Sequence, residues 1–278
     1  MPVHWMDISQ LSFNSLLLLE QVQLGWLPGW LPETELALAL RANPVVEWYF
    51  RHKCPKLNEW LNRVLTQADP ADCANLEKVR QAEITVMQAM NDLLVYAIDP
   101  SIYDAQPFLE WSSQELSSLA DFTGKIVIDV GAGTGRLALI AAPAAEAVFA
   151  VEPVGNLRAF LKAKARSQGL KNVFPVDGLI TDIPLPDEFA DITMGGHVFG
   201  ETLEAEFREL ERVTKPGGMI ILCPGNSDAD NETQTYLVAQ GFLWSRFEEP
   251  VDGMKRKYWK NTLHKGELST AQGQADSV

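Results

Sequence analysis

The sequence has few cysteines, few histidines and fewer basic than acidic side chains, and each shortage disfavours a class of protein. Its three cysteines, Cys54, Cys73 and Cys223, are odd in number and far apart, which argues against a disulfide framework and a paired-cysteine metal site. The four histidines form no HxH or HxxxH pair, so we predict no metal site. With 23 Lys and Arg against 37 Asp and Glu, the formal net charge of −14 disfavours a nucleic-acid partner bound through its phosphates.

Long apolar runs are also missing. No segment approaches the roughly 18 uninterrupted apolar residues that a membrane-spanning helix needs. The apolar run from Leu16 to Leu19 ends at Glu20 and lacks the basic flank and cleavage site of an export signal. We therefore expect a cytoplasmic protein with reduced thiols and no membrane partner. Because 46% of the residues are hydrophobic, the chain has enough apolar material for a sizeable core.

The pattern of the sequence changes near Phe122. Before this residue, apolar side chains recur at spacings of three and four, which indicates helices, and prolines mark their boundaries. The predicted helices cover residues 11–24, 33–41, 44–51, 57–65, 76–97 and 106–120. We therefore expect residues 1–120 to form an all-helical N-terminal region that acts as a lid, a dimer interface or both.

From Lys125 onward, short β-branched runs alternate with helical patterns. The predicted strands cover residues 125–130, 147–152, 172–177, 190–196 and 218–224, followed by two antiparallel strands within 241–249 and 254–263. Strands that alternate with helices imply βαβ units and a parallel sheet. We assign residues 121–265 to this α/β domain and expect the polar residues 266–278 to be disordered.

The turn after the first predicted strand is rich in glycine and reads Asp129-Val-Gly131-Ala-Gly133-Thr-Gly135. Glycine lets the chain turn tightly and lets a ligand approach the backbone. Glu152 ends the next strand, where a carboxylate can accept both hydroxyls of a ribose. A dinucleotide fingerprint, GxGxxG, would need glycine at the position of Arg136, which argues against a nicotinamide-dependent oxidoreductase.

This turn resembles motif I of the class I S-adenosylmethionine-dependent methyltransferases, in which an acid stands two positions before the first glycine. Residues 183–196 are similar to the segment before and within strand four of that family. Residues 210–222 are similar to its helix–turn–strand segment, whose turn reads KPGG. The resemblance covers about residues 122–262. It implies a Rossmann-like fold with a mostly parallel seven-stranded sheet and a C-terminal antiparallel hairpin.

The resemblance also implies S-adenosyl-L-methionine as cofactor and S-adenosyl-L-homocysteine as product. Asp129 matches the acid near the methionine part, Glu152 the ribose-binding acid, and Asp177 the residue that pairs with the adenine amino group, a role for which Asp182 competes. Arg136 either neutralises the cofactor carboxylate or faces solvent. The complete set of predicted cofactor residues is Asp129, Gly131, Ala132, Gly133, Gly135, Arg136, Glu152, Pro153, Asp177, Gly178, Leu179 and Gly195.

Candidate residues for the acceptor side are fewer. His197, just past the fourth predicted strand, is either a general base or substrate contact, or a histidine that anchors the loop after Gly195. Tyr103 and Trp111 either fold over the cofactor and touch the substrate or pack in the core. The expected function is methyl transfer to a small-molecule acceptor. The alternative is an inactive cofactor-binding module that acts on a protein partner through its helical region.

Overall fold

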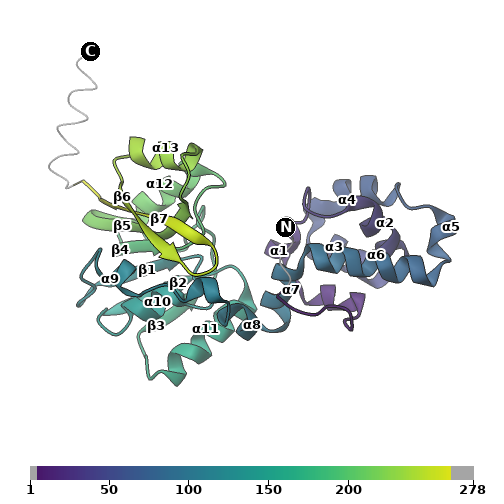
Figure 1. Cartoon of the computed structure of the whole chain (residues 1–278), viewed down its shortest axis with the longest axis horizontal. Coiled ribbons are helices and arrows are strands. Elements are labelled where there is room, and N and C mark those ends of the chain that lie inside the picture. The colour runs from purple at the N-terminus through teal and green to yellow at the C-terminus, as the bar shows by residue number, and fades with distance from the viewer. Residues whose placement is uncertain (1–4, 264–278) are drawn as a thin grey trace, which may run out of the picture. The chain divides into compact units, whose positions relative to one another are not determined.

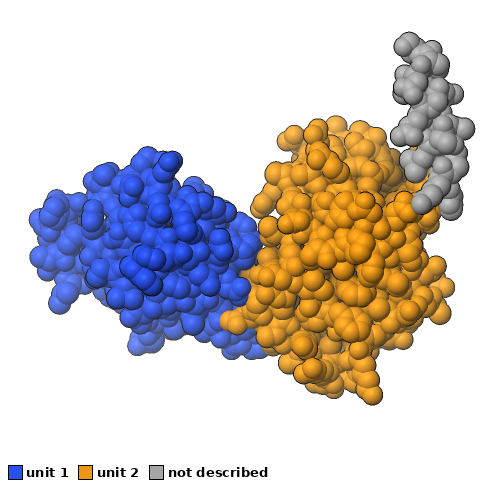
Figure 2. Space-filling model, turned by 180° about the vertical axis from the view of Figure 1, so that it is seen from behind, with its two compact units in different colours: residues 1–105 blue, residues 106–278 orange. Residues whose placement is uncertain are grey.

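The chain folds into two compact units, residues 1–105 and residues 106–278 (Figure 1, Figure 2). The computed structural model describes residues 5–263, so the segment 266–278, predicted to be disordered, lies outside the described residues. The unit boundary falls before residue 106, not after the predicted residue 120. The reason is that Trp111 and Leu116 are buried in the same apolar cluster as Val127 of the sheet, which ties this segment to the second unit.

The first unit, described from residue 5, is built from helices, as the apolar spacing predicts. Most of its helices turn apolar residues to one shared core; in α4, for example, Trp60, Leu61, Val64 and Leu65 are buried. The helices are η1 (Phe13–Leu18), α1 (Gln21–Gly25), α2 (Glu33–Ala42), α3 (Pro44–Lys53), η2 (Pro55–Leu57), α4 (Asn58–Leu65), α5 (Pro70–Cys73), α6 (Leu76–Ala89), α7 (Asn91–Ile98) and α8 (Pro100–Asp104).

Three of the predicted helices are broken in the structure. The segment 11–24 divides at Glu20, whose side chain caps α1 in a capping box with Gln23. The segment 76–97 divides at Met90, next to Asn91, whose buried side chain binds the backbone of Trp5 and Met6. The segment 106–120 contains only the short helices η3 (Pro107–Leu109) and α9 (Gln114–Ser117).

The second unit contains a seven-stranded sheet in the order β3-β2-β1-β4-β5-β7-β6. Strands β1 to β5 are parallel, and β7 runs antiparallel to both of its neighbours, β5 and β6. This is the Rossmann-like methyltransferase fold that the sequence predicts. The strands are β1 (Ile126–Val130), β2 (Ala147–Val151), β3 (Val173–Val176), β4 (Ala190–Gly195), β5 (Thr214–Ser227), β6 (Leu243–Glu249) and β7 (Gly253–Asn261).

Helices cover both faces of this sheet. The apolar cluster on one face includes Leu137 of α10 (Arg136–Ala141) and Leu161 of α11 (Gly155–Ser167). The cluster on the other face includes Phe207 of α12 (Leu203–Val213) and Leu237 of α13 (Glu232–Ala239). Because the carboxyl ends of parallel strands lie at one edge of a sheet, the turns that follow β1 to β5 gather there, and this is the edge at which α/β folds bind ligands.

Candidate functional site

The glycine-rich turn between β1 and α10 exposes backbone instead of side chains. Gly131, Gly133 and Gly135 have φ values of 65°, 52° and 92°, in the left-handed region that favours glycine. A Cβ atom on Gly131 would lie 2.6 Å from Cγ2 of Val198, so there is also no room for a side chain at this position. Ala132, by contrast, is buried beneath the turn. A bound molecule can therefore approach the backbone of the turn without meeting a side chain at these three glycines.

Glu152, directly after β2, fixes this turn in place. Its side chain is only 5% exposed, and its two oxygens accept hydrogen bonds from the backbone N–H groups of Gly133 and Val154, both at 2.9 Å. The carboxylate therefore stands at the end of β2, beside the glycine-rich turn, which is the position at which an acid binds a ribose in nucleoside-binding α/β folds. Pro153 lies between Glu152 and Val154 in this corner.

Asp129, the fourth residue of β1, is buried beneath the turn. Its carboxylate is 1% exposed and accepts a hydrogen bond from the backbone N–H of Ala138 at 2.8 Å. Burial, together with the nearby charge of Glu152, raises the pKa of Asp129 to about 8 even though that hydrogen bond opposes the rise. The side chain therefore holds α10 against β1, and its role toward a cofactor stays a prediction.

On the β3 side, Asp177 stands at the open edge of the sheet. Its side chain is 73% exposed, and its Oδ1 accepts a hydrogen bond at 3.0 Å from Arg158 of α11, which also donates to the carbonyl oxygen of Glu152. Asp182 is exposed, and its backbone pairs with that of Leu179. The ion pair places Asp177 next to Glu152, as neighbouring subsites for a nucleoside require.

Two glycines at this edge lie where the chain is too tightly packed for a side chain. A Cβ atom on Gly178 would lie 2.5 Å from Cδ of Pro184, so the chain after Asp177 packs tightly against the next turn. A Cβ atom on Gly195, the last residue of β4, would lie 2.7 Å from Cγ1 of Val198. Since Val198 also lies against Gly131, one side chain covers the ends of both β1 and β4.

The loop after β4 carries His197, which has a φ of 56°, unusual for a residue other than glycine. Its backbone N–H donates to the carbonyl oxygen of Pro224, at 2.9 Å. Its Nε2 lies 2.7 Å from Oε1 of Glu249, the last residue of β6, and the ring of Phe108 meets the imidazole edge to face. Sequence reasoning missed Glu249, because a strand-ending acid 52 residues away carries no spacing signal.

Three further residues predicted for the site make contacts of their own. Arg136 donates a hydrogen bond to the carbonyl oxygen of Trp111, and its guanidinium lies 4.8 Å from the centre of the Trp111 ring. Trp111 itself is 2% exposed and packs against Phe247, so it is a core residue and offers almost no surface to a substrate. Tyr103 belongs to α8 of the first unit, where its ring contacts that of Tyr96.

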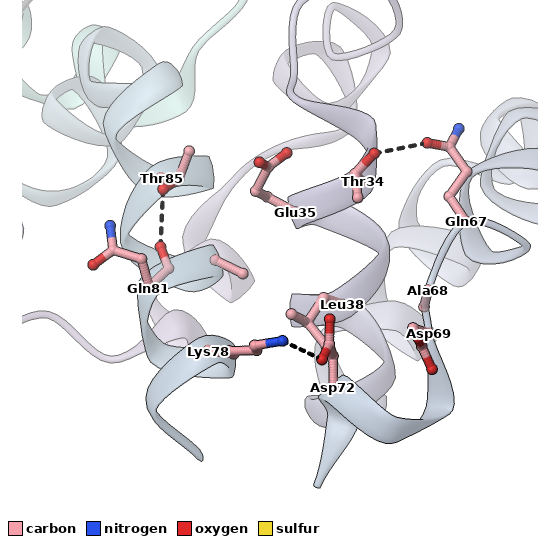
Figure 3. A pocket seen from close by; sticks show the side chains of 11 residues that line it. Thr34, Glu35, Leu38, Gln67, Ala68, Asp69, Asp72, Lys78, Gln81 and Thr85 are labelled. Atoms are coloured by element: carbon pink, nitrogen blue, oxygen red, sulfur yellow. Dashed lines mark hydrogen bonds and ion pairs between the residues drawn. The ribbon is translucent and has the colours of Figure 1, made fainter. Parts of the chain in front are cut away.

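The structure also contains hollows away from the glycine turn. Figure 3 shows one of about 340 Å³ in the first unit, lined by polar side chains of α2 and α6 and of the segment 67–72. There, the Nζ atom of Lys78 lies 2.6 Å from Oδ1 of Asp72, and this contact raises the pKa of Lys78. Another, of about 510 Å³, lies beside α12 and α13 and is lined by Gly200, Arg208 and Tyr236 among others. Neither hollow includes the residues of the turn.

Residues 5–263 lack two kinds of feature, a cluster of metal ligands and a membrane-spanning helix. Within that range, no group of three or more His, Cys, Asp or Glu side chains is placed to hold a metal ion. None of its helices has the length and apolar character needed to cross a bilayer. Within β5, burial raises the pKa of the Cys223 thiol to about 12, so this thiol stays protonated at neutral pH and is a poor nucleophile.

In comparison with known proteins, a family model described as "Methyltransferase domain" matches residues 128–222. An uncharacterized methyltransferase of Geobacillus thermodenitrificans is 27% identical over 151 residues, which are 52% of this chain and 66% of that protein. A demethylmenaquinone methyltransferase of Geobacillus kaustophilus is 29% identical over 129 residues, 44% of this chain and 54% of that protein. The chain thus spans less than two thirds of either relative.

Among solved structures, an S-adenosylmethionine-dependent methyltransferase from Aquifex aeolicus superposes with a TM-score of 0.47 at 20% identity. The match covers 60% of this chain and all of that one.

Proposed function

We propose that this chain, whose second unit contains a domain of the class I S-adenosylmethionine-dependent methyltransferase family, transfers a methyl group to a small-molecule acceptor. S-adenosylmethionine is the cofactor of the family, and it supplies a methyl group activated by a positively charged sulfur. The acceptor and the residues that bind the cofactor are part of what we propose.

The observation that carries the proposal is the position of Glu152 beside the glycine-rich turn. Its buried carboxylate holds the N–H group of Gly133, so the acid that would bind the ribose hydroxyls is fixed against the turn. Asp177 stands next to it, linked through Arg158, and provides an acceptor for an adenine amino group. The two acids end neighbouring strands, so they can receive neighbouring parts of one nucleoside.

The contribution of the chain to the reaction is mainly alignment. Methyl transfer is an in-line displacement, so a rigid turn and a dry pocket lower the barrier by holding donor and acceptor in position. Glu152 and Asp177 orient the nucleoside, while Val198, packed on Gly131 and Gly195, keeps the ends of β1 and β4 covered. A small-molecule acceptor is supported by the demethylmenaquinone methyltransferase among the relatives.

Thermal melts with separate ligands test this function. We expect S-adenosylmethionine and S-adenosylhomocysteine to raise the melting temperature of the full chain, because a ligand at 100 times its Kd stabilises by about 2.7 kcal/mol. Glu152→Gln, which keeps the side-chain volume, should lose this ligand-induced shift. Glu146→Ala, an exposed acid just before the start of the same strand β2, should keep it.

Two outcomes would overturn the proposal. A shift with NAD(H) and none with the sulfur compounds would identify a different cofactor. A shift with S-adenosylmethionine, combined with no release of S-adenosylhomocysteine over a broad panel of small molecules, would favour a binding module without chemistry.

A further inference from the structure

A fully buried carboxylate holds one side of the His197 imidazole. Glu249 is 0% exposed, and its Oε1 lies 2.7 Å from Nε2 of His197. Its other oxygen, Oε2, lies 3.1 Å from Nζ of Lys255, the third residue of β7. A buried carboxylate needs a partner of opposite charge, and the Lys255 ammonium supplies one.

This contact fixes which imidazole nitrogen carries the proton. A neutral histidine beside an ionised carboxylate donates its N–H to that carboxylate, here from Nε2 to Glu249. The lone pair then lies on Nδ1, at the opposite side of the ring. The imidazole of His197 is 34% exposed, whereas its partner is completely buried, so the ring joins the interior of the protein to the open edge of the sheet.

Two bonds hold His197 in its place. Its backbone N–H binds the carbonyl oxygen of Pro224, at 2.9 Å, and its side chain binds Glu249. The φ of 56° lies in the left-handed region, which is costly for residues other than glycine. The strained residue stands two positions after β4 and directly before Val198, the side chain that lies on Gly131 of the turn.

We propose that His197 is the general base of the methyl transfer, that Glu249 is its positioning residue, and that the acceptor is a hydroxyl compound of the phenol or enol class. This inference rests on the proposed function of the same site. A hydroxyl of this class keeps its proton at neutral pH and needs a base, whereas a thiolate does not.

In this step, Nδ1 of His197 takes the hydroxyl proton while the acceptor oxygen forms a bond to the methyl carbon. The bond between that carbon and sulfur breaks, and the sulfur keeps the electron pair. The resulting imidazolium is stabilised by Glu249 and later releases its proton to water. Atoms and charges balance, because one positive charge is lost at sulfur and one proton is delivered to the solvent.

The experiment compares phenol with thiophenol as acceptor probes in the full-length protein. His197→Asn keeps a residue that tolerates positive φ, Glu249→Gln keeps the side-chain volume, and Glu248→Gln removes a neighbouring exposed charge from the same strand as a control. Release of S-adenosylhomocysteine is followed for each probe, and binding of S-adenosylmethionine is measured by calorimetry.

We expect His197→Asn to lower kcat/KM for phenol about 10²-fold, the usual contribution of a general base, and to leave transfer to thiophenol unchanged. Glu249→Gln should show the same selective loss, and Glu248→Gln should behave as the wild type. Cofactor binding should be retained in all of these variants.

A second measurement needs no acceptor. Diethyl pyrocarbonate modifies accessible imidazoles that carry a free lone pair, and mass spectrometry resolves each histidine. Glu249→Gln should slow modification of His197 while the exposed His52, whose Nδ1 faces the carbonyl oxygen of Trp48, reacts at an unchanged rate.

Each remaining outcome has a definite meaning. Equal loss with phenol and thiophenol, or no turnover of phenol by a wild type that binds the cofactor, overturns the inference. An unchanged modification rate in Glu249→Gln overturns the role of Glu249. Failure of the wild type to bind S-adenosylmethionine overturns the proposed function of the site instead.

Discussion

Replacing Asp129 by asparagine is expected to make the stability of the second unit less dependent on pH. The carboxyl group has a pKa of about 8 in the folded chain, raised from an ordinary value of 3.8 mainly by burial. At about 1.4 kcal/mol for each pH unit, this difference corresponds to about 6 kcal/mol. Asparagine keeps an oxygen that can accept the N–H group of Ala138, and it carries no titrating proton.

The sign follows from proton uptake in the two states. Below pH 4 both the folded and the unfolded chain hold the proton, and the full stability is present. Between pH 4 and 8 only the folded chain holds it, so stability falls as pH rises, and above pH 8 the loss is complete. Wild type and Asp129→Asn should therefore differ by an amount that changes by about 4 kcal/mol between pH 5 and 8, in favour of the variant at the higher pH.

Hydrogen exchange in increasing urea, read by mass spectrometry, measures this difference without ligand. Peptides from β1 and β4 report the free energy of unfolding of the second unit, and peptides from α6 in the first unit serve as an internal control. A constant difference between the two proteins from pH 5 to 9 would refute the reasoning, because it would mean that Asp129 has the same pKa in both states.

Three further substitutions test the packing around the site. Gly131→Ala should destabilise the second unit by about 1–3 kcal/mol, because the new Cβ would press against Val198 and alanine would have to adopt a positive φ. An unchanged free energy of unfolding in a denaturant titration would show that the turn tolerates a side chain here. Glu206→Gln should lower the free energy of unfolding by about 1–3 kcal/mol, because the buried carboxylate accepts hydrogen bonds from the N–H groups of residues 200–202. Hydrogen exchange of these three N–H groups should become faster, and an unchanged rate would argue against this role of Glu206. Trp111→Ala should cost about 3–5 kcal/mol by opening a cavity, and a change within about 0.5 kcal/mol in the same titration would place this residue outside the core.

The sheet could be predicted from the sequence because its signals are local. A buried parallel strand is a short continuous apolar run, and β1, β2 and β4 coincide with predicted runs to within a residue. Adjacent segments of chain make up the glycine-rich turn and the end of the next strand, so their neighbourhood was also predictable.

Features that depend on distant contacts were not predictable. Apolar spacing continues through Met90, but the helix breaks where Asn91 reaches back to Trp5, and periodicity carries no trace of such a bond. The same limit applies to Glu249. In the sheet, β5 and the antiparallel β7 lie between β4 and β6, so β4 and β6 run in the same direction and their carboxyl ends lie at the same edge. Glu249 meets His197 at this edge, and this arrangement exists only in the folded sheet.

The place of β7 in the sheet has a consequence for synthesis on the ribosome. The last strand among residues 5–263 is an inner strand, since β7 lies between β5 and β6. While the chain is growing, β5 exposes an unpaired edge and β6 has no partner until residue 261 has emerged. Residues 1–105 form a separate compact unit and can fold long before that moment. We therefore expect nascent chains stalled before β7 to be protease-sensitive in the second unit alone, and to be the stage at which protection by chaperones matters most.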